Sequence, residues 1–218
     1  MSQLRIKTFV VNPLEVNCYV VSDDTREAVI IDPGCFARSE WDDVAQYIRT
    51  ERLTLRHCLL THAHFDHIMG CHWAEQDFHV RPQLHTDDVP LYQTLPQQAL
   101  QFFGIRLKTQ PAPVLERCLN EGSQVSFGHT TLTALHTPGH SPGCLCFHCA
   151  GEGVIFTGDT LFCGSMGRTD LPGGDPRQMA TSLLRLGQLP PSTVAHPGHG
   201  PRTTIANERT WIQAYYNR

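Results

Sequence analysis

Several features are missing from this sequence. There is no run of 18 apolar residues that could cross a membrane, and the N-terminal segment lacks the basic start and continuous apolar stretch of a signal peptide. Basic residues number 17 against 21 acidic ones, and they form no cluster. These absences exclude a membrane-spanning helix, predict a cytoplasmic protein, and argue against a nucleic-acid or anionic-membrane partner.

The sequence also lacks a cysteine pattern that would indicate disulfides. The nine cysteines are an odd and dispersed set, which in a reducing compartment predicts free thiols in a core. The run from Cys144 to Cys149 lacks the second cysteine pair that a zinc knot needs, so we expect a strand with inward thiols. No linker divides the 218 residues, and we therefore predict a single domain over 1–218.

Hydrophobic patterning predicts strands and helices in both halves of the chain. An amphipathic helix is expected over 40–51, capped by Ser39, with Trp41, Val44, Ala45 and Ile48 on its buried face. Further helices are expected over 68–78, 86–103 with interruptions at Pro90 and Pro96, 176–186 and 205–216. Strands are expected over 4–11, 18–22, 28–31, 55–60, 79–85, 124–127, 130–136, 143–148, 154–157 and 192–195. Two strand-rich halves, each followed by helices, indicate an α+β protein with two sheets packed face to face and helices outside.

A cluster of imidazoles and one carboxylate directly follows the predicted strand 55–60. It contains His62, His64, Asp66 and His67. Side chains two positions apart in an extended segment point the same way, so His62 and His64 can bind one cation. Asp66 and His67, after a turn, can point at a second cation. The cluster therefore predicts a metal site at the end of a strand.

Three further candidate ligands each follow a predicted strand: His140, Asp159 and His199. Glycine beside each of them lets the backbone turn sharply and approach a cation. Seven donors are enough for two metals that share one carboxylate. His136 and His196 begin the loops of His140 and His199; we expect neither to be a direct ligand, and a supporting role is left open for both. The other histidines are expected to be surface or packed residues: His57, His72, His79, His85, His129 and His148.

The segments THAHFDH, TPGHSPG, TGDTLF and HPGHG together resemble the metallo-β-lactamase superfamily, with spacing most similar to its glyoxalase II branch. The resemblance implies a four-layer αββα sandwich of two mixed sheets, with the site at one edge. It also implies two divalent ions, with zinc favoured over iron or a mixture. In that pattern His62, His64 and His140 hold the first ion, Asp66, His67 and His199 hold the second, and Asp159 bridges them.

The stretch GDTLFCGSMGRTDLPGGD resembles small bacterial glyoxalase II-like hydrolases. Glyoxalase II hydrolyses S-D-lactoylglutathione, and the resemblance implies that Arg168 contacts the substrate and that Asp66 orients a hydroxide nucleophile. Two departures stand out: the sequence has Pro201 where larger enzymes carry a tyrosine, and it has no C-terminal helical domain for glutathione. The predicted substrate is therefore a small acyl-thioester, with the thiol left open.

Other functions stay open on the sequence alone. A persulfide dioxygenase shares the fold but uses one iron, two histidines and one aspartate, and a lactone or ester hydrolase needs the same metals as a thioesterase. A metal-stabilised module without activity is a third alternative. The oligomeric state is open between monomer and homodimer, and the Gln-rich segment 86–103 could serve as a dimer surface or a lid.

Overall fold

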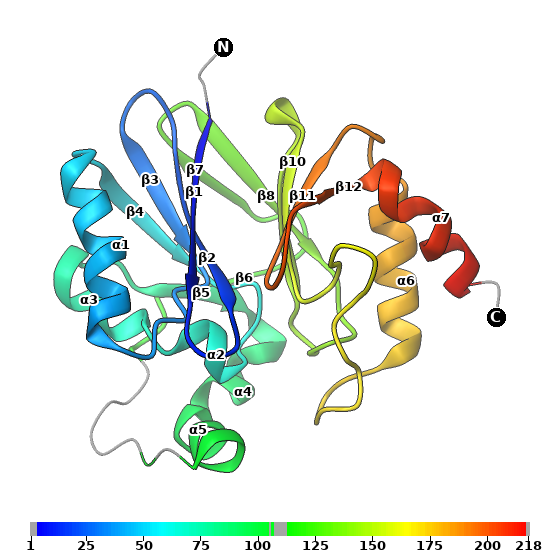
Figure 1. The fold of residues 1–218 in the computed structure, drawn as a ribbon, viewed down its shortest axis with the longest axis horizontal. Helices are drawn as coiled ribbons and strands as arrows, with labels where there is room; N and C mark the ends of the chain where they lie inside the picture. The colour runs from blue at the N-terminus through cyan, green and yellow to red at the C-terminus, as the bar shows by residue number, and fades with distance from the viewer. Residues whose placement is uncertain (1–3, 105, 107–112, 217–218) are drawn as a thin grey trace.

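A computed structural model describes residues 4–104, 106 and 113–216, and Figure 1 shows their arrangement. The strands form two six-stranded mixed sheets. The first sheet contains, in spatial order, β1 (Arg5–Val11), β2 (Val16–Ser22), β3 (Glu27–Ile31), β4 (Thr54–Leu59), β5 (Pro82–His85) and β6 (Arg117–Leu119). The second contains β12 (Thr203–Thr204), β11 (Val194–Pro197), β10 (Val154–Gly158), β9 (Leu145–Cys149), β8 (Thr130–His136) and β7 (Gln124–Phe127).

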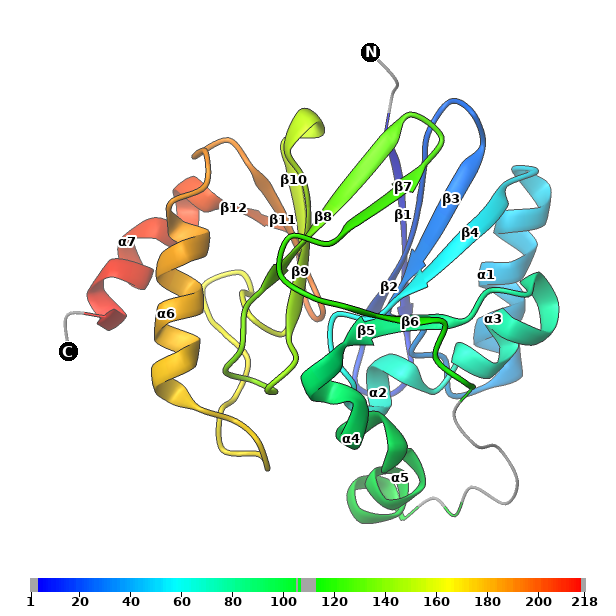
Figure 2. The same cartoon turned by 180° about the vertical axis from the view of Figure 1, so that it is seen from behind.

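Helices cover the outer faces of both sheets, as Figures 1 and 2 show. The first sheet is accompanied by α1 (Arg38–Thr50), α2 (Phe65–Ile68), α3 (Cys71–Phe78), the 3-10 turn η1 (Thr86–Asp88), α4 (Val89–Gln93) and α5 (Leu95–Phe103). The second is accompanied by the 3-10 turn η2 (Ala150–Glu152), α6 (Pro176–Gly187) and α7 (Ile205–Tyr216). The predicted four-layer αββα sandwich is therefore confirmed.

The alternation of side chains along β2 explains the layers. Val20 faces outward and packs with Trp41 of α1 in one apolar cluster, whereas Tyr19 and Val21 face inward. The inward cluster lies between the sheets and includes Phe156 of β10. A third cluster lies under α6 and α7. Because successive strand residues point to opposite faces, a strand that is buried along its whole length, such as β2, can contribute to two cores at once.

The predicted helix starts need correction. The expected face of α1 is buried, but Ser39 is not its cap, because the helix begins at Arg38. The carboxylate of Glu40 instead accepts hydrogen bonds from the backbone N–H groups of Phe36 and Ala37, at 2.7 and 3.0 Å. The segment 86–103 is divided next to both prolines, as expected, into η1, α4 and α5. Pro90 and Pro96 lie in the first turns of α4 and α5, where a backbone N–H would have no partner within the helix.

Other boundaries differ by a few residues. The helix expected over 68–78 begins only at Cys71, as α3, and the short α2 before it was not predicted. The two helices are separated at Gly70, where an added Cβ would lie 2.5 Å from the carbonyl oxygen of Pro33. The short strands β6 and β12 were not predicted. All nine cysteines are free, and only Cys118 and Cys163 are exposed. No helix among the described residues is long and apolar enough to cross a membrane.

Candidate metal centre

The seven candidate ligands come together at one edge of the sandwich, in loops that follow four strands. The segment with His62 to His67 follows β4 of the first sheet. His140, Asp159 and His199 follow β8, β10 and β11 of the second sheet. All are buried except His199, whose side chain is 25% exposed. Strand ends of both sheets thus converge on one place, although the segments are far apart in sequence.

The first group consists of His62, His64 and His140, whose potential ligand atoms lie close together. The Nδ1 of His64 lies 2.8 Å from the Nε2 of His140. On the opposite side of the His140 ring, Nδ1 lies 2.7 Å from the carbonyl oxygen of Arg168 and must donate to it. This hydrogen bond leaves the lone pair of His140 Nε2 directed at the group.

The second group consists of Asp66, His67 and His199. The Oδ2 of Asp66 lies 3.6 Å from His67 Nε2 and 3.5 Å from His199 Nε2. The Nδ1 atoms of both histidines are occupied elsewhere: that of His67 donates to Asp32 at 3.0 Å, and that of His199 to the carbonyl oxygen of Leu14 at 2.9 Å. Both Nε2 atoms therefore face the group.

Asp159 lies between the two groups. Its Oδ2 is 3.4 Å from His140 Nε2 and 3.6 Å from His199 Nε2, and its Oδ1 is 3.5 Å from His67 Nε2. Two donors bound at about 2.1 Å to one tetrahedral ion lie about 3.4 Å apart. The distances from Asp159 to His140, His67 and His199 therefore fit donors that would share one ion on each side of Asp159.

Several buried polar atoms of the site have no hydrogen-bond partner, as expected for atoms that bind a cation. Among the described residues, the buried Nε2 atoms of His62 and His67 and the buried Oδ1 of Asp159 have no hydrogen-bond partner. Buried polar atoms are rarely left unpaired, because their desolvation is not offset. Imidazole and carboxylate donors suit zinc and iron alike. The donor set therefore fits a pair of divalent metal ions.

The charges around His67 favour a cation. Burial would lower the pKa of His67, but the carboxylates of Asp66, Asp159 and Asp32 outweigh it and raise that pKa to about 10. Burial lowers the pKa of His64 to about 3, so this imidazole is neutral. Burial opposes the ionisation of Asp66, yet His67 and His199 bring its pKa down to about 2. Without a metal, a proton on His67 supplies the positive charge that the carboxylates attract.

We expect metal binding to release protons at pH 8. His67 is protonated there in the metal-free protein, since its pKa is about 10, and Nε2 must lose its proton to bind a metal. Titrating Zn²⁺ into the metal-free protein in two buffers of different ionisation enthalpy measures this release by calorimetry. His67→Ala should release about one proton fewer. Equal binding enthalpies in both buffers would contradict the assignment of a charged His67.

Two buried carboxylates that were not predicted from the sequence support these ligands. Asp32 accepts hydrogen bonds from the N–H and hydroxyl of Thr61, at 2.8 and 2.7 Å, in addition to that from His67. The sequence indicated only a turn at this position, although an aspartate at the end of an apolar strand is itself a signal. Asp32 holds the start of the His62 segment and sets the tautomer of His67.

Asp88 connects the two ligand loops. Its Oδ2 accepts hydrogen bonds from the N–H of Ala63 and the hydroxyl of Ser141, each at 2.8 Å. Its Oδ1 accepts one from the N–H of Gly143 at 2.7 Å. Ala63 lies between His62 and His64, and Ser141 follows His140. Burial raises the pKa of Asp88, and these hydrogen bonds oppose the rise. Asp88 therefore fixes the distance between the two loops.

A cavity of about 550 Å³ opens over the metal centre, and Arg168 lines it. The apolar side chains in its wall are Leu14, Phe65, Phe162 and Leu171. The guanidinium of Arg168 is 62% exposed and forms two hydrogen bonds of 2.6 Å with Asp170. The cavity can thus take an apolar group beside the metal ligands, and its one arginine is already paired with a carboxylate.

Comparison with known proteins places the chain in a family. The model of the Metallo-beta-lactamase superfamily matches residues 11–199. The chain belongs to the metallo-beta-lactamase superfamily. Among its relatives, the hydroxyacylglutathione hydrolase GloC of Haemophilus influenzae is 36% identical over 209 residues, covering 94% of this chain and 95% of GloC.

Solved structures of the superfamily are also similar. The BLEG-1 B3 metallo-beta-lactamase is 36% identical with a TM-score of 0.85, covering 94% of this chain and 97% of its own. TTHA1623, solved in a di-iron-bound form, is 39% identical with a TM-score of 0.81, covering 93% and 96%. ETHE1 from Myxococcus xanthus is 25% identical with a TM-score of 0.79, covering 98% and 85%. These neighbours share the fold of this metallo-beta-lactamase superfamily chain.

The two flanking histidines of this superfamily member lie outside both ligand groups. His136 approaches His85 and Asp87, but the imidazoles of His136 and His85 stack in parallel at 3.9 Å and 8°. Their lone pairs lie in the ring planes and do not converge on one ion. His196 faces a different cavity.

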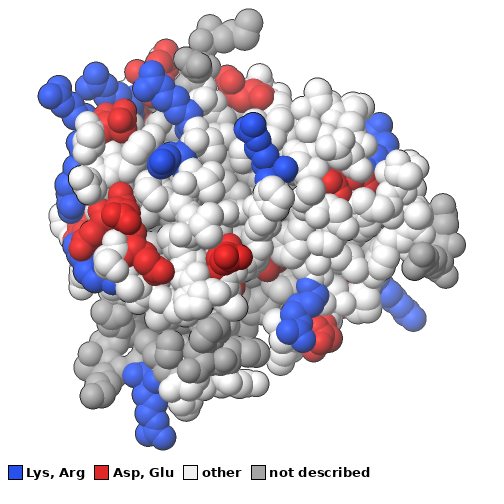
Figure 3. All heavy atoms as spheres, viewed as in Figure 1, with Lys and Arg blue, Asp and Glu red and all other residues white. Residues whose placement is uncertain are grey.

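On the face shown in Figure 3, acidic and basic side chains are interspersed.

Proposed function

We propose that the protein is a dinuclear metallohydrolase that cleaves S-D-lactoylglutathione or a related acyl-thioester. The observation that carries this proposal is the position of Asp159, within 3.4 to 3.6 Å of histidines from both ligand groups. The similarity to the hydroxyacylglutathione hydrolase GloC supports the substrate class. The similarity to a di-iron-bound structure supports two metals, either zinc or iron.

The residues of the site suit this chemistry. Two divalent ions held by the two ligand groups and Asp159 would supply a hydroxide nucleophile at neutral pH and offset the charge on the substrate carbonyl oxygen. Asp66, whose pKa is about 2, is ionised and can accept a hydrogen bond from the attacking water, which orients it. Phe65 and Leu171 provide apolar contacts for the acyl or thiol portion. A thiol leaving group has a pKa near ~8.5 and needs little protonation.

Hydrolysis of S-D-lactoylglutathione by the purified, metal-loaded protein tests the proposal. We expect turnover, and we expect His64→Ala to remove it because the first ligand group loses a donor. His148→Ala is the matched control, since this partly buried histidine of β9 lies outside both groups. A folded, metal-loaded protein that hydrolyses neither this substrate nor other acyl-thioesters would overturn the proposal.

A mononuclear iron dioxygenase acting on persulfides is the second candidate. The observation that favours it is the group of His62, His67 and Asp159, because two imidazoles and one carboxylate are the ligand set of such iron enzymes. Oxygen consumption with glutathione persulfide, in place of thioester hydrolysis, would identify this activity. Turnover of lactones or simple esters in the same assays would instead identify a hydrolase of another substrate class.

A further inference from the structure

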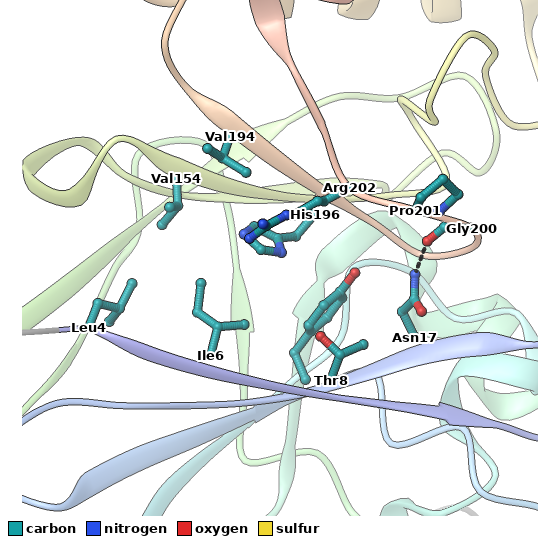
Figure 4. A pocket seen from close by; sticks show the side chains of 11 residues that line it. Leu4, Ile6, Thr8, Asn17, Val154, Val194, His196, Gly200, Pro201 and Arg202 are labelled. Carbon is teal, nitrogen blue, oxygen red and sulfur yellow. Dashed lines mark hydrogen bonds between the residues drawn. The ribbon is translucent and has the colours of Figure 1, made fainter.

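A second cavity, of about 570 Å³, lies between the two sheets on the side of β1 (Figure 4). Leu4, which precedes β1, and Ile6 of β1 form one wall, and Val154 of β10 and Val194 of β11 form the other. None of its lining residues lines the cavity over the metal centre. A volume of this size is typical of sites for small molecules.

The imidazole of His196 is buried against this cavity. The residue is 7% exposed, and its ring stacks on Phe156 at 5.2 Å and meets the edge of Tyr19 at 5.6 Å. Within the described residues, neither ring nitrogen has a hydrogen-bond partner, and Figure 4 shows the ring facing the open space. Burial, aided by Arg202, lowers the pKa of His196 to about 4. The imidazole is therefore neutral at neutral pH and offers one N–H donor to a ligand.

Arg202 adds a positive charge next to this donor. Its side chain lies beside His196 in Figure 4, and in the described part of the chain no carboxylate pairs with it. A guanidinium is always charged and matches the two oxygens of a carboxylate. One cation and one neutral donor suit a single negative charge, whereas a phosphate dianion would leave charge unbalanced.

We propose that this cavity binds a small monocarboxylate with an apolar body. The carboxylate would accept hydrogen bonds from Arg202 and His196, and the hydrocarbon would lie between Ile6 and Val194. The site is independent of the thioesterase proposal, because it uses no residue of the metal centre.

Calorimetric titration of hexanoate into the metal-loaded protein tests this site, with hexan-1-ol as a neutral ligand of the same length. We expect saturable binding of hexanoate, and at least about tenfold weaker binding of hexanol because Arg202 loses its charged partner. Arg202→Gln and His196→Phe should each raise the Kd for hexanoate at least about tenfold. Phenylalanine at 196 keeps the packing on Phe156 while removing the donor.

Two further variants distinguish binding in this cavity from binding elsewhere on the protein. Ile6→Trp leaves both polar groups in place but fills the space, so it should also prevent binding. Arg177→Gln removes a positive charge at the start of α6 and should leave the Kd unchanged. Hexanoate bound at the metal centre would survive all three cavity variants and compete with the thioester. Undetectable binding at millimolar hexanoate, or the same Kd in all variants, would overturn the proposal.

Discussion

Asp159→Ala should reduce thioester hydrolysis by about a thousandfold or more, which corresponds to about 4 kcal/mol of lost transition-state stabilisation. The carboxylate lies 3.4 Å from His140 of the first group and 3.5 Å from His67 of the second. In the proposed dinuclear site its removal would take a donor from both ions at once, and it would also leave His67 with less negative charge nearby. We therefore expect the metal content to fall from about two ions per chain to one or fewer.

Metal analysis and steady-state kinetics on the same preparation measure both effects. Asp170→Ala is the matched control, because this exposed carboxylate in the same loop pairs with Arg168 and not with the ligand groups. The control should keep its full metal content. If Asp159→Ala stayed folded and kept both its metals and its activity, the bridging role would be wrong.

Asp88→Ala should destabilise the protein and loosen its metals together. The substitution leaves three buried donors without an acceptor, from Ala63, Ser141 and Gly143. Breaking a buried charged network of this kind costs about 3–5 kcal/mol, which lowers the Tm by roughly 10 °C in a protein of this size. Because Asp88 connects the loops of His64 and His140, metal affinity should fall about 10- to 100-fold.

Thermal unfolding and competition with a metal chelator measure these two effects. Asp88→Asn keeps one oxygen acceptor and should give intermediate losses in both. Asp87→Ala is the control, since the neighbouring carboxylate is 55% exposed and outside the loop connection. An Asp88→Ala protein as stable as the parent, with unchanged metal affinity, would show that the loops are held in place by other contacts.

The ligand cluster was accessible from sequence because its information is local. His62, His64, Asp66 and His67 lie within six residues, and each of the other three candidates follows a strand in a glycine-containing loop. Functional residues are common in loops that follow strands, so the position of these three residues directly after predicted strands is enough to identify them as candidates. Asp32 also follows a strand, but the residues that Asp32 and Asp88 support lie 25 to 55 positions away, so the sequence alone does not pair them with the ligands.

The layers were likewise predictable, but only some of the element ends were. The predicted bounds of β7, β8 and α7 agree with the structure, and for β7 and β8 the alternation of apolar residues and the adjacent turn residues define them. Ser39 was a reasonable local cap, but Glu40 takes that role while its carboxylate also accepts from the N–H of Asn12, a tertiary contact. β6 and β12 have three and two residues, too few for periodicity to be visible.

We propose that this metallo-beta-lactamase superfamily chain hydrolyses thioesters with two metal ions. The most direct test is turnover of S-D-lactoylglutathione by metal-free protein, followed as zinc or iron(II) is added in measured equivalents. The account predicts no turnover without metal and a rise that reaches its plateau at about two equivalents per chain. A plateau at one equivalent, or turnover that persists in the metal-free protein, would contradict it.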